Sequence, residues 1–491
     1  MSETTGGNYN TAIGYQAMYL DNGMANIHNT FVGQGIASGN WANNPCTHNT
    51  GLGSGVMQGN MDGALGNTAL GVDSLNALTS GDYNTAQGFN AGASLNTGGY
   101  NVLIGYNSGD ALTSSAGNVF VGISAGSACT DTANAVLIGN GAGEDSDIAS
   151  DGTIAIGYQA LKPLTSGTRN LAIGYQSGGF TNSGSDNTLI GYRSGSQGDT
   201  YGLTTGGRNV ALGSHAFGGS ASAHITGSNN TALGPEALLN AQETVADNTA
   251  VGQNALYALT TGSSNVAIGS EALETVTTGK MSVAVGYQAL HSQTHPADGT
   301  NNSRNTMVGT QCGDDVTSGK NNTGIGAECA FDIDADNQTA LGYQATTDSA
   351  NDIAIGNTSV DEVKGQVDFS TFSDKRIKTD IKNTDVGLEF INLLKPRKFK
   401  KVNPAEYPSS IKKKTDGVSG EWTDAQANKV WDGLIAQEVK EAMDSCNVTF
   451  SGWNEEKNSK QLITYSTMVM PLIKAVQELS AKVTELESKL K

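Results

Sequence analysis

A unit of about 17 residues recurs along the first three quarters of this 491-residue chain. The typical copy reads Asn, then Thr or an aliphatic residue, a small or apolar residue, an aliphatic residue and Gly, as in the run from Asn170 to Gly174. The residue before the glycine is aliphatic in nineteen of the twenty copies, with Gln87 as the exception. The closing glycines number twenty and stand at positions 14, 33, 53, 71, 88, 105, 122, 139, 157, 174, 191, 213, 234, 252, 269, 286, 309, 326, 342 and 356. A repeat of this kind predicts a stack of equivalent structural units.

Short β-strands explain the unit better than helices do. Seventeen residues cannot hold two helices, and Gly and Thr are poor helix formers. The aliphatic residue before each glycine and the residue two positions earlier point to one face of a strand, and the residue between them points to the other. Both faces are apolar, so one would line the interior of a β-coil and the other must be covered by another chain. We predict a parallel β-solenoid that rises ~4.8 Å per coil.

Two further positions of the unit carry structural information. Asn begins fifteen of the twenty copies, where its side chain can bond neighbouring backbone at a turn. The third residue after each glycine is nearly always Ala, Ser or Cys, with Ile36 and Val56 as exceptions, which predicts a tightly packed site. Cys312 and Cys329 both occupy this site, and we expect packed thiols unless neighbouring coils bring them to disulfide geometry.

Charge and glycine content divide the chain at Ser373. Residues 1–372 contain 59 of the 64 glycines, with 8 basic against 30 acidic residues, whereas residues 373–491 contain 20 basic against 17 acidic residues. We predict a mainly β shaft over 1–365, a linker over 366–372 and a small α/β module over 373–491. The net charge of −19 argues against nucleic acid as a partner. No apolar run approaches ~20 residues, so we expect no membrane insertion.

The C-terminal module contains two candidate functional features. Ser373 and Lys378 are residue types that can serve as a nucleophile and its base, a role that the family resemblance described below implies, since a desolvated lysine can take the proton of a serine hydroxyl. The alternative is that Ser373 and Asp374 cap a helix that begins near Arg376. The last segment, 470–491, carries a 4-3-4-3-4 apolar pattern typical of a coiled-coil seam, unless it is an amphipathic helix packed within one chain. The seam residues are Leu472, Val476, Leu479, Val483, Leu486 and Leu490.

Both parts of the chain resemble known families. The repeats of residues 8–360 resemble the head repeats of trimeric autotransporter adhesins, which are parallel β-rolls assembled as trimers. The runs Ser373–Lys378, Gly387–Pro396, Gly433–Val439 and Met470–Leu479, together with Tyr465, resemble the C-terminal intramolecular chaperone and auto-processing domain of phage endosialidases, tail spikes and tail fibres. This second resemblance implies a homotrimer that a Ser–Lys dyad cuts once. The matching residues are Ser373 and Lys378, and the expected cleavage lies between Phe372 and Ser373.

These features together predict a phage tail fibre or tail spike. We expect a virion protein, assembled in the host cytoplasm, that binds a host cell-surface receptor such as a glycan and contacts other tail or baseplate proteins. One alternative is a polysaccharide depolymerase, although no pair of carboxylates is placed convincingly for glycan hydrolysis. Another is a bacterial trimeric surface adhesin, disfavoured because the expected signal peptide and membrane anchor are missing. A Thr-based ice-binding surface is disfavoured because many coils replace Thr by Val, Leu or Ile.

We expect neither a cofactor nor a metal. Asp332, Asp334 and Asp336 alternate, but the glycine and glutamate of a calcium-binding EF-hand loop are missing, so a solvated acidic loop is favoured. His291 and His295 are four residues apart, but Pro296 argues against a helix that presents both to one ion.

Overall fold

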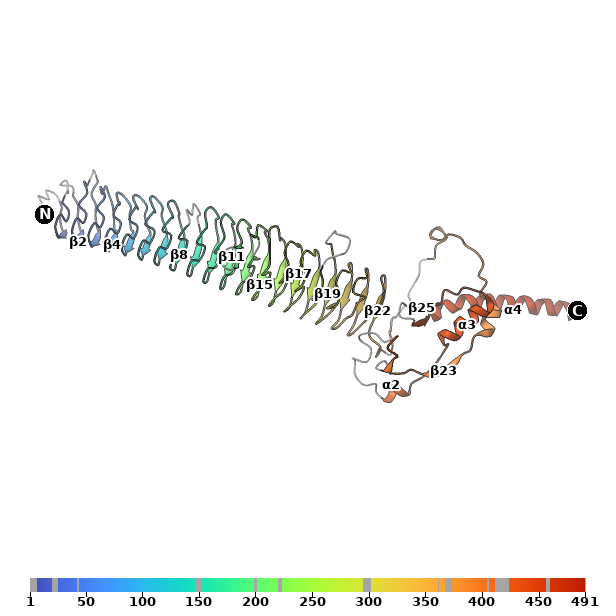
Figure 1. Ribbon diagram of the computed structural model, residues 1–491. Helices are drawn as coiled ribbons and strands as arrows, with labels where there is room; N and C mark the ends of the chain where they lie inside the picture. The colour runs from blue at the N-terminus through green and yellow to red at the C-terminus, as the bar shows by residue number, and fades with distance from the viewer. Residues whose placement is uncertain are drawn as a thin grey trace. The chain divides into compact units, whose positions relative to one another are not determined.

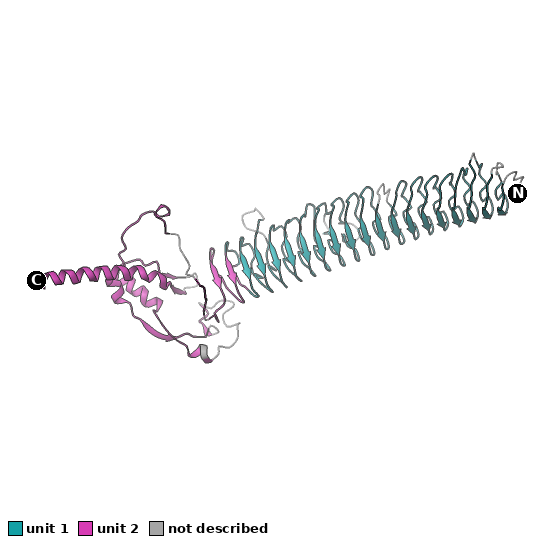
Figure 2. Cartoon of the chain, turned by 180° about the vertical axis from the view of Figure 1, so that it is seen from behind, with its two compact units in different colours: residues 1–328, 333–337 teal, residues 329–332, 338–491 magenta. Residues whose placement is uncertain are grey.

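The computed structural model describes most of the chain as two compact units (Figure 2). Unit 1 comprises Met1–Glu328 and Ile333–Asn337, and unit 2 comprises Cys329–Asp332 and Gln338–Lys491. The described residues are 7–19, 25–41, 44–145, 152–197, 201–219, 223–294, 302–360, 362–366, 373–403, 406–410, 424–455 and 460–490. Unit 1 is a long stack of β-coils, and unit 2 holds two coils and a small domain that ends in a helix (Figure 1).

All twenty predicted repeat strands are present, and each ends at the residue before its glycine. Those of unit 1 are β1 (Thr11–Ile13), β2 (Thr30–Val32), β3 (Thr50–Leu52), β4 (Thr68–Leu70), β5 (Thr85–Gln87), β6 (Val102–Ile104), β7 (Val119–Val121), β8 (Val136–Ile138), β9 (Ile154–Ile156), β10 (Leu171–Ile173), β11 (Thr188–Ile190), β14 (Val210–Leu212), β15 (Thr231–Leu233), β16 (Thr249–Val251), β17 (Val266–Ile268), β18 (Val283–Val285), β19 (Thr306–Val308) and β20 (Thr323–Ile325). Unit 2 begins with β21 (Thr339–Leu341) and β22 (Ile353–Ile355). An insertion in unit 1 adds the antiparallel pair β12 (Ser196–Gln197) and β13 (Tyr201–Gly202).

Neighbouring repeat strands pair in parallel and in the register of the repeat. Thr11 lies opposite Thr30 and Ala12 opposite Phe31, and the same correspondence continues from coil to coil. The middle residue of each strand from β2 to β21 is buried inside the coil, whereas the residues on either side are half-buried or exposed. Ile13 is 59% exposed and Leu52 is 50% exposed. The predicted mainly β, parallel β-solenoid fold is confirmed, and its outer sheet face is apolar within a single chain.

The two exceptions at the small site have a packing explanation. Ile36 and Val56 are both fully buried. They fill space that Gly51 leaves empty at the middle of β3, because a Cβ at Gly51 would meet the side chains of Ile36 at 2.9 Å and Val56 at 3.1 Å. The larger side chains of Ile36 and Val56 therefore compensate for the missing side chain of Gly51, as close packing requires.

The asparagines that begin the repeats form a buried ladder. Asn84 donates from its backbone N and from Nδ2 to Oδ1 of Asn67, at 2.9 and 3.0 Å, and its Nδ2 also donates to the Gly98 carbonyl. Its own Oδ1 accepts two equivalent hydrogen bonds from Asn101. Every polar group of the Asn84 side chain thus has a hydrogen-bond partner. These hydrogen bonds compensate for the free energy that burying the amide would otherwise cost.

The turns of each coil rely on backbone conformations with positive φ. The second residue after the repeat glycine has φ of 51° at Gln159 and Gln176, and 52° at Arg193. The residue before the Asn position shares this conformation, as at Tyr83 and Asp186. The repeat glycine itself has φ of +134° at Gly157, where an added Cβ would overlap the carbonyl oxygen of Gly174 in the next coil. Glycine is therefore required at Gly157 for two reasons: its positive φ, and the close approach of the next coil's backbone.

We expect Gly157→Ala to destabilise the shaft strongly. The strained backbone alone costs about 1–3 kcal/mol, and the overlap with Gly174 adds to it. Thermal unfolding followed by circular dichroism should show a clearly lower midpoint than wild type. Gly152→Asn is the matched control, because Gly152 has φ of +75°, its added Cβ meets nothing closer than 3.9 Å, and Asn134 holds the same conformation at the equivalent place. Equal midpoints for the two variants would contradict this account.

The rest of unit 2 is a small α/β domain. Its elements are η1 (Lys375–Ile377), α1 (Leu388–Leu393), β23 (Arg397–Lys400), α2 (Asp424–Asn428), β24 (Val430–Gly433), α3 (Ala436–Cys446), β25 (Trp453–Glu455), β26 (Gln461–Ile463), η3 (Tyr465–Met468) and α4 (Val469–Leu490). β23 pairs with β24 and β25 with β26, both antiparallel. The core gathers Phe390 of α1, Val439 and Met443 of α3, and Phe450.

The cysteines are reduced in this structure. All five lie in the described residues and none forms a disulfide. Cys312 and Cys329 are buried, as expected for packed thiols. No helix in the described residues is both long enough and apolar enough to cross a bilayer.

Candidate self-cleavage site and assembly surfaces

Ser373 and Lys378 meet at the start of the small domain. The ammonium Nζ of Lys378 donates a hydrogen bond to Oγ of Ser373 over 2.7 Å. The single turn of η1, between the two residues, folds the chain back so that side chains five positions apart touch. This is the contact that a lysine base needs to take the proton of a serine hydroxyl. The other side of the expected cleavage, Phe372, lies outside the described residues.

The helix cap at this turn is made by Asp374 and not by Ser373. Asp374 accepts a hydrogen bond from the backbone N of Arg376 over 2.8 Å and pairs with the Arg376 guanidinium. The side-chain hydrogen bond from Arg376 holds the pKa of Asp374 below its usual value. Because Asp374 takes the capping role, the hydroxyl of Ser373 remains available to Lys378. The sequence had offered both Ser373 and Asp374 as candidate caps of a helix near Arg376, and the structure gives this role to Asp374. The ion pair between Asp374 and Arg376 was not predicted.

Both members of the dyad are exposed in the single chain. A lysine acts as a base only after losing its proton, and burial favours the uncharged form. In the single chain, Ser373 and Lys378 are therefore in contact. The described residues do not supply the surroundings that would exclude water from the Lys378 amine and so favour its neutral form.

A carboxylate of α4 links two of the sequence motifs. Oε2 of Glu478 accepts a hydrogen bond from the backbone N of Leu388, at the start of α1, over 2.8 Å. This backbone hydrogen bond lowers the pKa of Glu478. A Cβ at Gly387 would lie 2.7 Å from the Glu478 carboxylate oxygens, so the motif glycine makes room for this cap. The partners are 90 residues apart, and no local signal in the sequence joins them.

Further motif residues hold β24 and α3 in place. The hydroxyl of Tyr465 accepts a hydrogen bond from the backbone N of Leu434 over 2.8 Å. Arg397 makes two hydrogen bonds to the carboxylate of Glu438, at 2.7 and 3.1 Å, and these bonds lower the pKa of Glu438. The motifs around Gly433 and Tyr465 are thus parts of one packed framework.

None of the described residues covers the predicted seam on α4. Each of its six residues is between 47% and 87% exposed, and Pro471 and Ala475 are the α4 residues that are buried. The helix therefore presents its apolar stripe outwards, which does not fit the alternative of an amphipathic helix packed inside one chain.

The shaft contains a hollow of about 440 Å³ beside its β12–β13 insertion. Gln159, Lys162, Gln176 and Phe180 line it together with Ser196 of β12. Lys162 pairs with Glu144 at 3.2 Å and Asp145 at 3.5 Å. Burial acts to lower the pKa of Lys162, but these two carboxylates outweigh it and raise the pKa. The repeat glycines on either side of this insertion, Gly191 and Gly213, are 22 residues apart, but nothing in the sequence indicated a pocket.

The acidic loop and His291 have specific partners. Asp334 accepts hydrogen bonds from the hydroxyls of Ser318 and Thr317, which lower its pKa. Asp336 accepts from the backbone N of Lys320 over 3.0 Å. His291 contacts Glu274 of the preceding coil, whereas His295 lies outside the described residues.

Comparison with known families identifies the C-terminal module. Residues 373–447 match the model of the family described as chaperone of endosialidase. This module carries an endosialidase-type chaperone domain. The match begins at Ser373, where charge and glycine content also change, and it contains both Ser373 and Lys378. A comparison with curated proteins found no match. A parallel β-solenoid joined to this chaperone domain fits a phage tail fibre or tail spike.

Proposed function

We propose that this protein is a homotrimeric phage tail fibre or tail spike that attaches the virion to a host cell-surface receptor. Its chaperone domain brings three chains together and is then released by one self-cleavage between Phe372 and Ser373. The observation that carries this proposal is the hydrogen bond between Lys378 and Ser373 at the first residues of a domain matched to the endosialidase chaperones. The release point would therefore lie at the boundary between two chemically different modules.

Assembly explains how an exposed dyad would become active. A neighbouring chain that covers Lys378 would remove water from its amine and favour the neutral base. That base takes the proton of Ser373 Oγ as the oxygen attacks the Phe372 carbonyl carbon, and it then delivers the proton to the departing Ser373 nitrogen. Water hydrolyses the resulting ester between Phe372 and Ser373 Oγ. The products are a carboxylate on Phe372 and a free amine and hydroxyl on Ser373.

Two exposed apolar surfaces support a trimer. The outer face of the repeat strands carries residues such as Leu212 and Ile325, which are 48% and 51% exposed. The α4 seam adds a second stripe that a coiled coil would bury. Burying surface of this kind against identical chains is the largest favourable contribution available to assembly.

We expect the Ser373→Ala chain, which cannot cleave itself and so keeps α4, to sediment as a trimer at micromolar concentration. Leu479→Asp should shift it towards slower-sedimenting or aggregated species, because a charge in the seam would be buried without a partner. Ser480→Ala, a neighbouring exposed position outside the seam, should leave the trimer unchanged. A stable, folded monomer of the wild-type chain would contradict the trimer.

The hollow on the shaft is our candidate for the receptor-binding surface. It combines an aromatic ring, two amides and a charged pair, which suits a polar ligand such as a glycan. Its position beside the β12–β13 insertion agrees with recognition by segments inserted between coils. Other tail or baseplate proteins would then hold the remainder of the fibre.

Attachment is tested by binding the purified trimer to whole candidate host cells. We expect Lys162→Ala combined with Gln159→Ala to weaken binding by about tenfold, the scale of losing a hydrogen bond to a charged group. Tyr287→Ala, an exposed aromatic elsewhere on the shaft, is the matched control. Binding that both variants retain equally would exclude the hollow, and the absence of binding to every candidate host would contradict attachment by this chain. Shortening of capsule polysaccharide during incubation would favour the depolymerase alternative.

A further inference from the structure

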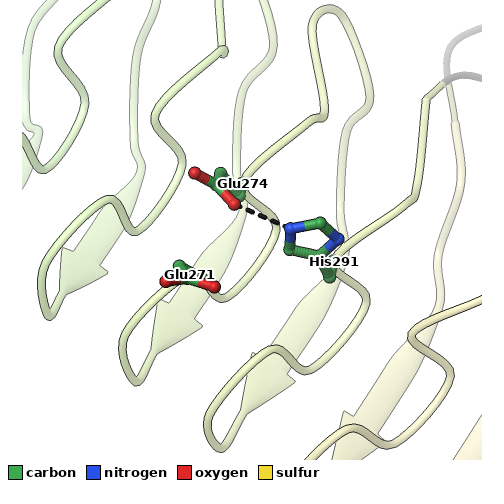
Figure 3. Close-up of side chains that lie close together, drawn as sticks. All are labelled: Glu271, Glu274 and His291. Atoms are coloured by element: carbon green, nitrogen blue, oxygen red, sulfur yellow. Dashed lines mark hydrogen bonds and ion pairs between the residues drawn. The ribbon is translucent and has the colours of Figure 1, made fainter.

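Three side chains that could ligate a metal converge on the shaft (Figure 3). Glu271 and Glu274 follow β17, and His291 follows β18 in the next coil. Nε2 of His291 lies 2.7 Å from Oε2 of Glu274. One ligand atom from each of the three residues lies within 4.8 Å of the other two. Donors from two successive coils thus meet at one point on the solenoid.

The repeat itself produces this arrangement. Glu274 and His291 each stand five residues after their repeat glycine, so they occupy the same place in successive coils. The backbone between them is tied by hydrogen bonds from Leu273 N to the Ala289 carbonyl, at 3.0 Å, and from Thr275 N to the His291 carbonyl, at 3.3 Å. The three donors are therefore held by a hydrogen-bonded framework and do not depend on a long loop.

Neighbouring amides orient the two carboxylates. Nε2 of Gln288 donates to Oε2 of Glu271 over 2.7 Å, and Nδ2 of Asn254 donates to Oε1 of Glu274 over 3.3 Å. Supporting hydrogen bonds of this kind are typical around metal ligands, because they fix the direction of the lone pairs. Neutral amides do not cancel the charge of two adjacent carboxylates, whereas a divalent cation would.

We propose that Glu271, Glu274 and His291 bind a divalent transition-metal ion of the zinc class. Imidazole nitrogen together with carboxylate oxygen suits such ions, whereas calcium and magnesium prefer ligand sets made of oxygen alone. The side chains of Glu274 and His291 are 23% and 31% exposed, so water can complete the coordination shell. Ligand atoms around tetrahedral zinc lie roughly 3.3 Å apart. Small rotations of the two carboxylates would reach that spacing.

The test is a calorimetric titration of the full-length protein, without a histidine tag, with Zn²⁺. We expect saturable binding of one ion per chain. Glu274→Gln, which preserves shape, and His291→Ala should each weaken it at least tenfold. Glu236→Gln and His215→Ala are matched controls and should bind as wild type. Glu236 holds the position in its coil that Glu271 holds in its own, and His215 is another shaft histidine. Circular dichroism verifies that each variant keeps its β-sheet signal.

A second measurement separates this site from adventitious binding. Zn²⁺ should raise the unfolding temperature of wild type and of Glu236→Gln, and a chelator should reverse the shift, because the ion would link two coils. No shift is expected for His291→Ala. Zinc binding that survives both Glu274→Gln and His291→Ala, or a preference for Ca²⁺ or Mg²⁺ over Zn²⁺, would overturn the proposal. So would the lack of stoichiometric binding by wild type. None of these outcomes depends on receptor attachment or on self-cleavage.

Discussion

Ser373→Ala is expected to abolish processing completely while leaving assembly intact. The substitution removes the hydroxyl that accepts the hydrogen bond from Lys378. Because Ser373 is exposed, its side chain is not part of the packed core of the domain, and folding should be unaffected. Wild-type protein should yield fragments 1–372 and 373–491, whereas the variant should remain a full-length trimer. Intact mass spectrometry combined with sedimentation measures both properties on one sample.

Lys378→Ala should give the same full-length trimer, because the base is lost. Lys378→Arg should also be inactive, since a guanidinium keeps its proton under all ordinary conditions. Lys375→Ala is the matched control: it removes a nearby lysine of the same turn, and processing should continue.

The rate of self-cleavage in the wild type should be first order in chain concentration, and cleavage should begin only once trimers have formed.

Two results would contradict the assigned dyad. Wild-type chains that stay full-length in folded trimers would mean that the domain is a permanent cap. Cleavage at the same bond in Ser373→Ala would mean that another nucleophile, or a protease of the expression host, is responsible.

Deleting residues 373–491 is expected to leave most of the remaining chain insoluble. Among the described residues, the repeat strands of the shaft pair with equivalent strands of neighbouring coils, and the successive copies are similar in sequence. Such strands can pair out of register, and non-local β-structure forms slowly while apolar surface is exposed. A chaperone domain that sets the register of three chains would remove this hazard.

The matched control for the deletion is the mature fragment itself. Fragment 1–372 made by self-cleavage has the same sequence as the truncated chain but has folded with the chaperone domain attached. We expect it to be a soluble, β-rich trimer, so that the two samples differ only in their folding history. Soluble β-rich trimers from the directly expressed truncation would show that the domain is not needed for assembly.

The architecture of the shaft could be predicted from local sequence patterns. The closing glycines and the aliphatic residues before them located all twenty strands and divided the strand residues between two faces, because both signals are local and repeat many times. The structure then showed that the middle residue is the one buried inside the coil. The motifs after Ser373 indicated the chaperone domain, and the resemblance to that family implied the Ser373–Lys378 pair. The two side chains meet because only the single turn of η1 separates them.

The contacts between side chains that are distant in the sequence became known from the three-dimensional structure. Glu478 reaches the backbone of Leu388 across 90 residues, and the buried Asn84 amide is satisfied by two neighbouring coils at once. Glu274 and His291 become partners because the stacking of coils brings together residues 17 positions apart. The sequence pattern had instead suggested His295 as the possible partner of His291. Local patterns specify strands and turns through backbone preference and burial. The contacts that build sites depend on how coils and helices stack, and that is set by the packing of the whole domain.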